Sequence, residues 1–157
     1  MVFKNNAQLE RFMLDKCKKA VANLENKIYA IIKSTLVQFY QEFTPEAYIR
    51  TNQLLHSLVK SEVKKVGNSY EAEVYFDASL LDYEHGWMET KADWYGYSNW
   101  DTDTILDIVM TGSDSGLPHG GWAEGTAIWT VSKERLGNIL SKLEYELKLQ
   151  GIPVRRA

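Results

Sequence analysis

A long amphipathic stretch near the N-terminus constrains the fold of this chain more than any other feature. Between residues 9 and 39 there is neither glycine nor proline, and apolar side chains recur every three or four residues. The apolar set is Leu9, Phe12, Met13, Cys17, Ala20, Val21, Leu24, Ile28, Ile31, Ile32 and Phe39. The pattern predicts a helix of roughly 45 Å, longer than a small globule usually needs. We therefore expect either a break near residues 33–35 or packing of part of the helix against a neighbouring subunit.

A shorter helix is predicted next. Thr44 suits the N-cap position and Pro45 the first helical position. This helix has an apolar edge, which is made of Leu54, Leu55, Leu58 and Val59.

A β-hairpin is predicted after the second helix. Residues 62–66 and 70–77 form its strands, and Gly67-Asn68 suits a two-residue turn with a positive φ at its first position. Apolar and polar residues alternate along the second strand, which predicts that one of its faces is exposed to water.

The segment that follows is rich in aromatic residues and loop-forming residues. Residues 78–83 could form one helical turn, residues 104–110 form a probable strand, and residues 111–121 have the composition of a loop. The candidate interface residues are Trp87, Trp94, Tyr95, Tyr97, Trp100 and Trp122. Trp and Tyr are enriched at protein–protein hot spots, so an interface is favoured over a sugar-binding platform. Nucleic-acid stacking is disfavoured because the neighbouring side chains are acidic.

A C-terminal helix is predicted from about Thr126 to Gln150. Its apolar stripe consists of Leu136, Ile139, Leu140, Leu143 and Leu147, and Gly151 is the expected stop. The expected fold class is therefore α+β, in a single domain over residues 1–157. That domain comprises a helical part (1–60), a hairpin or antiparallel sheet with a long aromatic loop (61–125), a helix (126–150) and an extended tail (151–157).

Charge and composition narrow the functional classes. Residues 1–60 carry nine Lys/Arg against five Asp/Glu, whereas residues 61–125 carry three against thirteen. An acidic middle disfavours reading of nucleic-acid sequence and suits a subunit that docks acidic faces onto basic ones. Cys17 falls on the apolar stripe and is expected to be a buried, inert thiol. The N-terminus does not resemble a signal peptide, and no apolar run approaches the ~18 residues that span a membrane.

Catalytic patterns are weak. His85 and His119, together with Asp82, Glu84, Asp101 and Asp103, could be imagined as metal ligands of a hydrolase, but their spacing matches no metal-binding motif. No nucleophile motif and no phosphate-binding loop is present. We therefore expect no enzyme activity, no metal and no cofactor. A metal-dependent hydrolase and a carbohydrate-binding module stay as the alternatives.

One motif lies directly after the long first helix and before the hairpin: Tyr-x(4)-Pro-x-x-Tyr-x-Arg-Thr-x-x-Leu-x-x-Ser. Its members are Tyr40, Pro45, Tyr48, Arg50, Thr51, Leu54 and Ser57, and a hairpin that ends in Asp77 follows it. The motif resembles that of the head-to-tail joining or tail-completion proteins of long-tailed bacteriophages, although Asn52 stands where the family usually has glycine. Arg50 is expected to be structural, bonding backbone carbonyls or a carboxylate.

The resemblance implies a minor structural protein of the virion that is made in the bacterial host cytoplasm. It implies a homo-oligomeric ring at the neck, between the connector or head-completion protein and the tail tube or terminator protein. DNA would only pass through its lumen, and no membrane would be involved.

Overall fold

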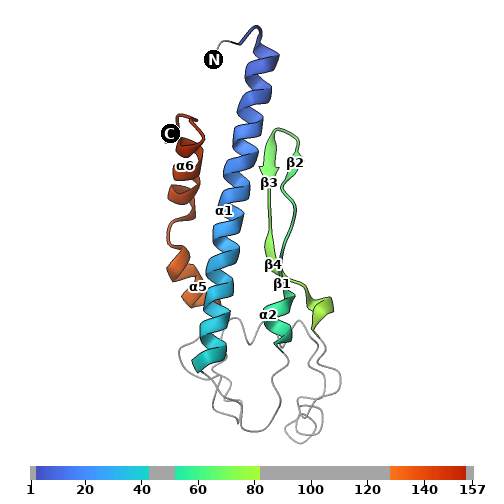
Figure 1. The fold of residues 1–157 in the computed structure, drawn as a ribbon, viewed down its shortest axis with the longest axis vertical. Coiled ribbons are helices and arrows are strands. Elements are labelled where there is room, and N and C mark those ends of the chain that lie inside the picture. Colours follow the sequence, from blue (N-terminus) through green and yellow to red (C-terminus); the bar gives the residue numbers. More distant parts are fainter. Residues whose placement is uncertain (1–2, 43–51, 82–127, 155–157) are drawn as a thin grey trace, which may run out of the picture. The chain divides into compact units, whose positions relative to one another are not determined.

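The computed structural model describes residues 3–42, 52–81 and 128–154 (Figure 1). Its helices are α1 (Asn6–Glu42), α2 (Gln53–Ser57), α5 (Ile128–Leu136) and α6 (Ile139–Leu149), with the 3-10 turn η1 (Ala78–Leu80). Its strands are β1 (Leu58–Lys60), β2 (Lys64–Val66), β3 (Ser69–Glu71) and β4 (Val74–Phe76). These strands form two small sheets, in which β1 pairs with β4 and β2 with β3. The mixture of helices and antiparallel sheet confirms the predicted α+β class.

The first helix is continuous, so the predicted break near residues 33–35 is wrong. Helix α1 runs for 37 residues, which corresponds to about 55 Å at 1.5 Å per residue. The hydroxyl groups of Ser34 and Thr35 donate to the carbonyl oxygen of Ile31 at 2.8 and 3.0 Å. Such bonds place short polar side chains inside a helix without interrupting it. The alternative expectation, packing against a neighbouring subunit, stays a prediction.

Burial along α1 is uneven. Ala20 and Leu24 are buried, as are Ile32, Leu36 and Phe39 further along. Before Ala20 no described residue of the helix is buried, although the apolar pattern is equally regular there. Cys17 is therefore only half-buried, and the expectation of a fully buried thiol is wrong.

The chain divides into two compact units. The first consists of residues 1–30, 60–74 and 136–157, and the second of residues 31–59 and 75–135. Helix α1 contributes to both. The single tail-completion-like domain over residues 1–157 stays a prediction.

In the first unit, the hairpin β2–β3 has the predicted turn. Lys64 pairs with Glu71 and Val66 with Ser69, and Gly67 has a φ of 59°. The predicted alternation is also confirmed, because side chains from Tyr70 to Phe76 are half-buried and exposed in turn.

The hairpin's second strand is not continuous, contrary to the prediction for residues 70–77. Strand β3 ends at Glu71, and β4 begins only at Val74. Between them, the backbone N–H of Glu73 donates to the side-chain oxygen of Ser61 at 2.9 Å, while the carbonyl of Glu73 accepts from the N–H of Ser61 at 2.9 Å. A serine hydroxyl thus takes the place of a backbone acceptor and interrupts the ladder.

In the second unit, helix α2 is shorter than predicted. Its expected start at Thr44-Pro45 lies outside the described residues, and α2 follows Asn52, whose φ is 59°. The helix ends at Ser57, because Leu58 has extended backbone angles and begins β1. Leu58 and Val59 are therefore strand residues, and the prediction that places them on the helix is wrong.

The predicted single C-terminal helix is also wrong, since α5 and α6 are separated by Gly137 and Asn138. Gly137 has a φ of 55°, and the side chain of Asn138 accepts from the N–H of Ser141 at 3.0 Å, which starts a new helix. The new start changes which side chains face inward, so that Ile139 and Leu140 of the predicted stripe are exposed.

The predicted stop at Gly151 is confirmed. Its φ is 80°, and the N–H groups of Gly151 and Ile152 donate to the carbonyls of Lys148 and Leu147 at 2.9 and 3.0 Å. This pair of bonds is a Schellman motif, which closes α6 with a left-handed glycine.

Candidate functional site

The motif between α1 and the hairpin is described in part. Tyr40 is half-buried on α1, and Leu54 and Ser57 are buried on α2. Pro45, Tyr48, Arg50 and Thr51 lie outside the described residues, and their predicted roles stay predictions. Also outside are all six aromatic interface candidates, Trp87, Trp94, Tyr95, Tyr97, Trp100 and Trp122, and the imagined metal ligands, Asp82, Glu84, His85, Asp101, Asp103 and His119.

The described end of the motif forms a hydrogen-bonded corner in the second unit. The side chain of Ser57 is fully buried, and its hydroxyl donates to the carbonyl of Leu54 at 2.9 Å. The carbonyl of Ser57 accepts from the N–H of Asp77 at 2.8 Å. The carboxylate of Asp77 then caps η1, accepting from the N–H and the hydroxyl of Ser79 at 3.0 and 2.6 Å. We call these four residues the Ser57–Asp77 corner.

The corner holds α2 against η1. Within it, the Ser57 hydroxyl is used locally by the helix, and the Asp77 carboxylate is occupied as a cap. A polar group that is buried and bonded in this way stabilises one backbone arrangement. The chemistry of the corner is therefore architectural, since its polar groups are engaged with one another rather than directed at a ligand.

The same unit contains a second polar link, between α5 and α1. Arg135 donates through Nη1 to the hydroxyl of Thr35 at 3.2 Å, and through Nη2 to the side-chain oxygen of Gln38. The guanidinium group has a fixed geometry, so two bonds from it restrict both the distance and the orientation of the two helices.

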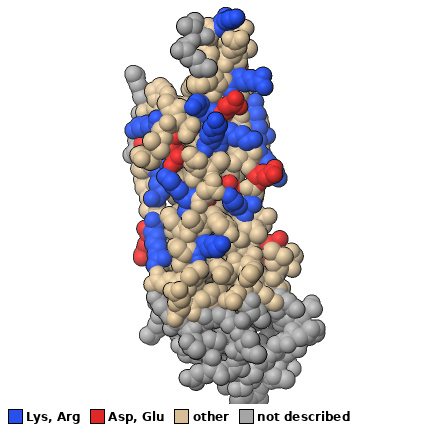
Figure 2. Space-filling view, in the orientation of Figure 1, with Lys and Arg blue, Asp and Glu red and all other residues tan. Residues whose placement is uncertain are grey.

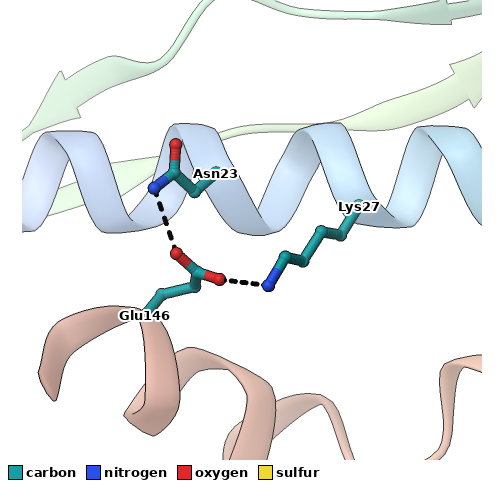
Figure 3. Close-up of polar contacts among 3 residues, drawn as sticks. All are labelled: Asn23, Lys27 and Glu146. Atoms are coloured by element: carbon teal, nitrogen blue, oxygen red, sulfur yellow. Dashed lines mark hydrogen bonds and ion pairs between the residues drawn. The ribbon is translucent and has the colours of Figure 1, made fainter. Parts of the chain in front are cut away.

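The first unit contains a buried carboxylate, on α6 (Figure 3). The side chain of Glu146 is 2% exposed. It accepts from Nδ2 of Asn23 at 3.0 Å and from Nζ of Lys27, both on α1. The bond from Lys27 lowers the pKa of Glu146 below its ordinary value of 4.5; burial opposes this shift and Asn23 supports it. Glu146 is therefore an ionised anchor between two helices.

Lys27, which donates to the Glu146 carboxylate, is itself partly exposed. Half of its side-chain surface is exposed, and its ammonium group lies 5.3 Å from the ring centre of Tyr145. No motif or pattern in the sequence singles out Glu146. The available signal was a glutamate three residues after Leu143, on the side of α6 where an apolar residue is expected.

Metal-binding chemistry finds no support in the part of the chain that the structure describes. Residues 3–42, 52–81 and 128–154 contain no group of three or more His, Cys, Asp or Glu side chains that could hold an ion. Of the helices in these ranges, none combines the length and the hydropathy required to cross a bilayer.

The fold and the corner thus define a small α+β protein whose described polar clusters are structural. A family model, YomN, matches residues 5–148, and the chain belongs to this YomN family. The family name is a phage-derived one, which supports a phage origin of the chain. Neither the curated proteins nor the solved structures include a match to this chain.

Proposed function

We propose that this phage protein is a structural component of the virion of a long-tailed phage. In this proposal it forms a homo-oligomeric ring at the head–tail junction and links the connector to the tail tube. The supporting observation is the Ser57–Asp77 corner, together with the motif that precedes it. The residues through which the chain resembles the joining and tail-completion family include Leu54, Ser57 and Asp77, which are bonded in sequence here.

The corner suits an assembly protein because it orders backbone without creating a reactive site. A subunit that is held between two partner rings needs surfaces of fixed geometry, since preorganisation reduces the entropy lost on binding. The link from Arg135 to Thr35 and Gln38 adds to this ordering in the same unit. Accordingly, the proposal assigns to the protein neither a chemical step nor a cofactor, and DNA only passes through the ring.

The test is a phage in which the gene is disrupted, combined with complementation from a plasmid. Without the protein, infected cells should accumulate filled heads and separate tails, which electron microscopy distinguishes from joined particles. Mass spectrometry of purified wild-type virions should detect the chain in a fixed copy number. Joined, infectious particles in the absence of the protein would contradict the proposal.

One double variant and a metal titration separate the structural role from the metal-hydrolase alternative. The double substitution His85→Ala and His119→Ala removes both loop imidazoles of that alternative, and it should complement the disrupted phage. Zinc or manganese titration of the purified protein should leave its stability unchanged. If a folded double variant fails to complement and wild-type protein binds the metal, the catalytic alternative replaces the proposed one.

A further inference from the structure

Residues 137–154, which we call the C-terminal arm, have few buried side chains to hold them in place. The arm comprises α6 with the residues on either side of it. The structure describes all of these residues, and among them only Glu146 and Ile152 are buried. The apolar side chains of Leu140 and Leu149 are 70% and 59% exposed. Removal of apolar area from water therefore contributes little to the attachment of the arm.

The attachment of the arm to α1 depends mainly on one carboxylate. Figure 3 shows the side chain of Glu146 pointing from α6 toward α1, where Asn23 and Lys27 donate to it. Half of the side-chain surface of Lys27 is exposed, and Asn23 is also exposed. Water therefore has access to both donors and competes with the carboxylate for them.

The charge of the surface favours return of a carboxylate that leaves this site. In the view of Figure 2, the described surface carries Lys and Arg side chains with fewer acidic ones among them. An ionised Glu146 that is released therefore remains near mainly positive charge. Release should be reversible, with the bonded form in the majority.

The turn at the start of the arm is not held by its surroundings. Gly137 has a φ of 55°, and apart from its chain neighbours no heavy atom of the described residues lies within 4 Å of the position that a Cβ would take. Helix α5, directly before it, has anchors of its own in the buried Ile128 and in the bonds from Arg135 to α1. The boundary between the two compact units falls at the same place, between Arg135 and Leu136. The arm is therefore free to move while α5 stays in place.

We propose that the C-terminal arm opens from α1 as one unit, with Glu146 as its anchor and Gly137 as its hinge, while the rest of the fold stays intact. A helix of 11 residues is not stable in water by itself, so the arm loses its helix when it opens. Opening also exposes Ile152 and the half-buried Leu143 and Leu147. The arm is thus a conformational device that changes how much apolar surface the subunit presents. This inference goes beyond the proposed function and does not depend on ring assembly.

The test is native-state hydrogen exchange of the full chain, measured by mass spectrometry of peptides. The amides of α6 should exchange together, because they share one opening reaction. Their protection should be about tenfold or more below that of residues 20–32 of α1, which exchange only when the fold opens as a whole.

Two substitutions separate opening of the arm from unfolding of the whole chain. Glu146→Gln weakens only the closed form of the arm, so it should raise exchange of α6 by about tenfold or more. Ile128→Val destabilises the closed and the open form equally, because α5 stays in place in both. It should therefore speed exchange of residues 20–32 by about threefold or more and leave α6 within about twofold of wild type.

A control and a milder variant accompany them. Glu134→Gln makes the same chemical change at an exposed position of α5 and should leave exchange of α6 unchanged. Asn23→Ala removes only one of the two bonds to Glu146, so it tests the anchor even if Glu146→Gln does not fold. It should raise exchange of α6 by about fivefold.

Three results would overturn the proposal. Equal protection of α6 and of residues 20–32 in wild type would show that the arm opens only with the whole fold. The same conclusion would follow if Ile128→Val sped exchange in both regions by the same factor. Unchanged exchange of α6 in both Glu146→Gln and Asn23→Ala would show that Glu146 does not anchor the arm.

Discussion

Helices α5 and α6 follow one another in the chain but are anchored by opposite kinds of residue. Helix α5 buries Ile128, Ser132 and Leu136, which are spaced by four residues and are all under 5% exposed. Helix α6 has one buried residue, the ionised Glu146, and it exposes Leu140, of which 70% is accessible. One helix is held chiefly by area removed from water, and the other depends on a directional bond to Lys27 and Asn23.

The two helices should therefore respond differently to substitution. Apolar burial is non-directional and scales with the volume of the side chain. A buried carboxylate depends on its partners and on its ionisation, because an unpaired charge in the interior is costly.

The largest effect should come from the apolar anchor of α5. Ile128→Ala removes a side chain that is 1% exposed, and it should lower the free energy of unfolding by about 2–4 kcal/mol. The matched control, Leu140→Ala on α6, should change it by less than about 0.5 kcal/mol. Urea unfolding monitored by circular dichroism measures both. Equal losses in the two variants would remove the contrast.

A smaller loss is expected from the polar anchor of α6. Glu146→Gln keeps the shape but removes the charge that Lys27 bonds, so unfolding free energy at pH 7 should fall by about 1.5–3 kcal/mol. Glu134→Gln, at an exposed position of α5, is the control and should have little effect. A neutral Glu146→Gln variant would show that α6 does not rely on this bond.

The stability that Glu146 contributes to the fold should also depend on pH. Folding lowers the pKa of Glu146 below its ordinary value of 4.5, so its stabilisation is fully present above that unfolded value and is lost as pH falls through the lower folded pKa. The difference in stability between wild type and Glu146→Gln should therefore be constant above about pH 5 and should shrink on acidification. A difference that grows in acid would contradict this sign.

The smallest effect should be at Ser132, the one polar member of the α5 stripe. Its hydroxyl is fully buried and has no hydrogen-bond partner among the described residues. Because an unpaired buried hydroxyl costs free energy, Ser132→Ala should be neutral or should raise stability by up to about 1 kcal/mol. Thermal melting resolves the change. A clear loss of stability would reveal a bond that this hydroxyl makes in solution.

Local signals in the sequence predicted the elements well where one residue type decides the backbone. The hairpin turn at Gly67 and the helix stop at Gly151 both have the positive φ that glycine adopts without strain. The long run without glycine or proline correctly indicated helix over residues 9–39, although it left open a break near residues 33–35 that the structure does not have. Gly137 has the same left-handed φ, yet the surrounding helical periodicity concealed it, and α5 and α6 were predicted as one.

Only some residues of the candidate site could be predicted from the sequence. Leu54 and Ser57 stood out through the motif, but the bond from the N–H of Asp77 to the carbonyl of Ser57 joins residues that are twenty positions apart. Glu146 was missed for the same reason, because its partners Asn23 and Lys27 lie more than a hundred residues away in the chain. Periodicity reports which face of an element is apolar, and it carries no information on which distant residue meets that face.

Local preferences in the sequence were enough to predict the α+β class, the presence of a long first helix, the hairpin turn and the stop of α6. Each of these follows from backbone preferences within a few neighbouring residues, so no distant contact was needed to decide it. Only the tertiary structure shows that Leu58 leaves the helix for a strand and that α6 is anchored by Glu146. It also shows that the described residues bury Ala20 and Leu24 but none of the residues before them on α1. The physical reason is that burial depends on which elements come together, and the same amphipathic pattern occurs whether or not a partner covers it.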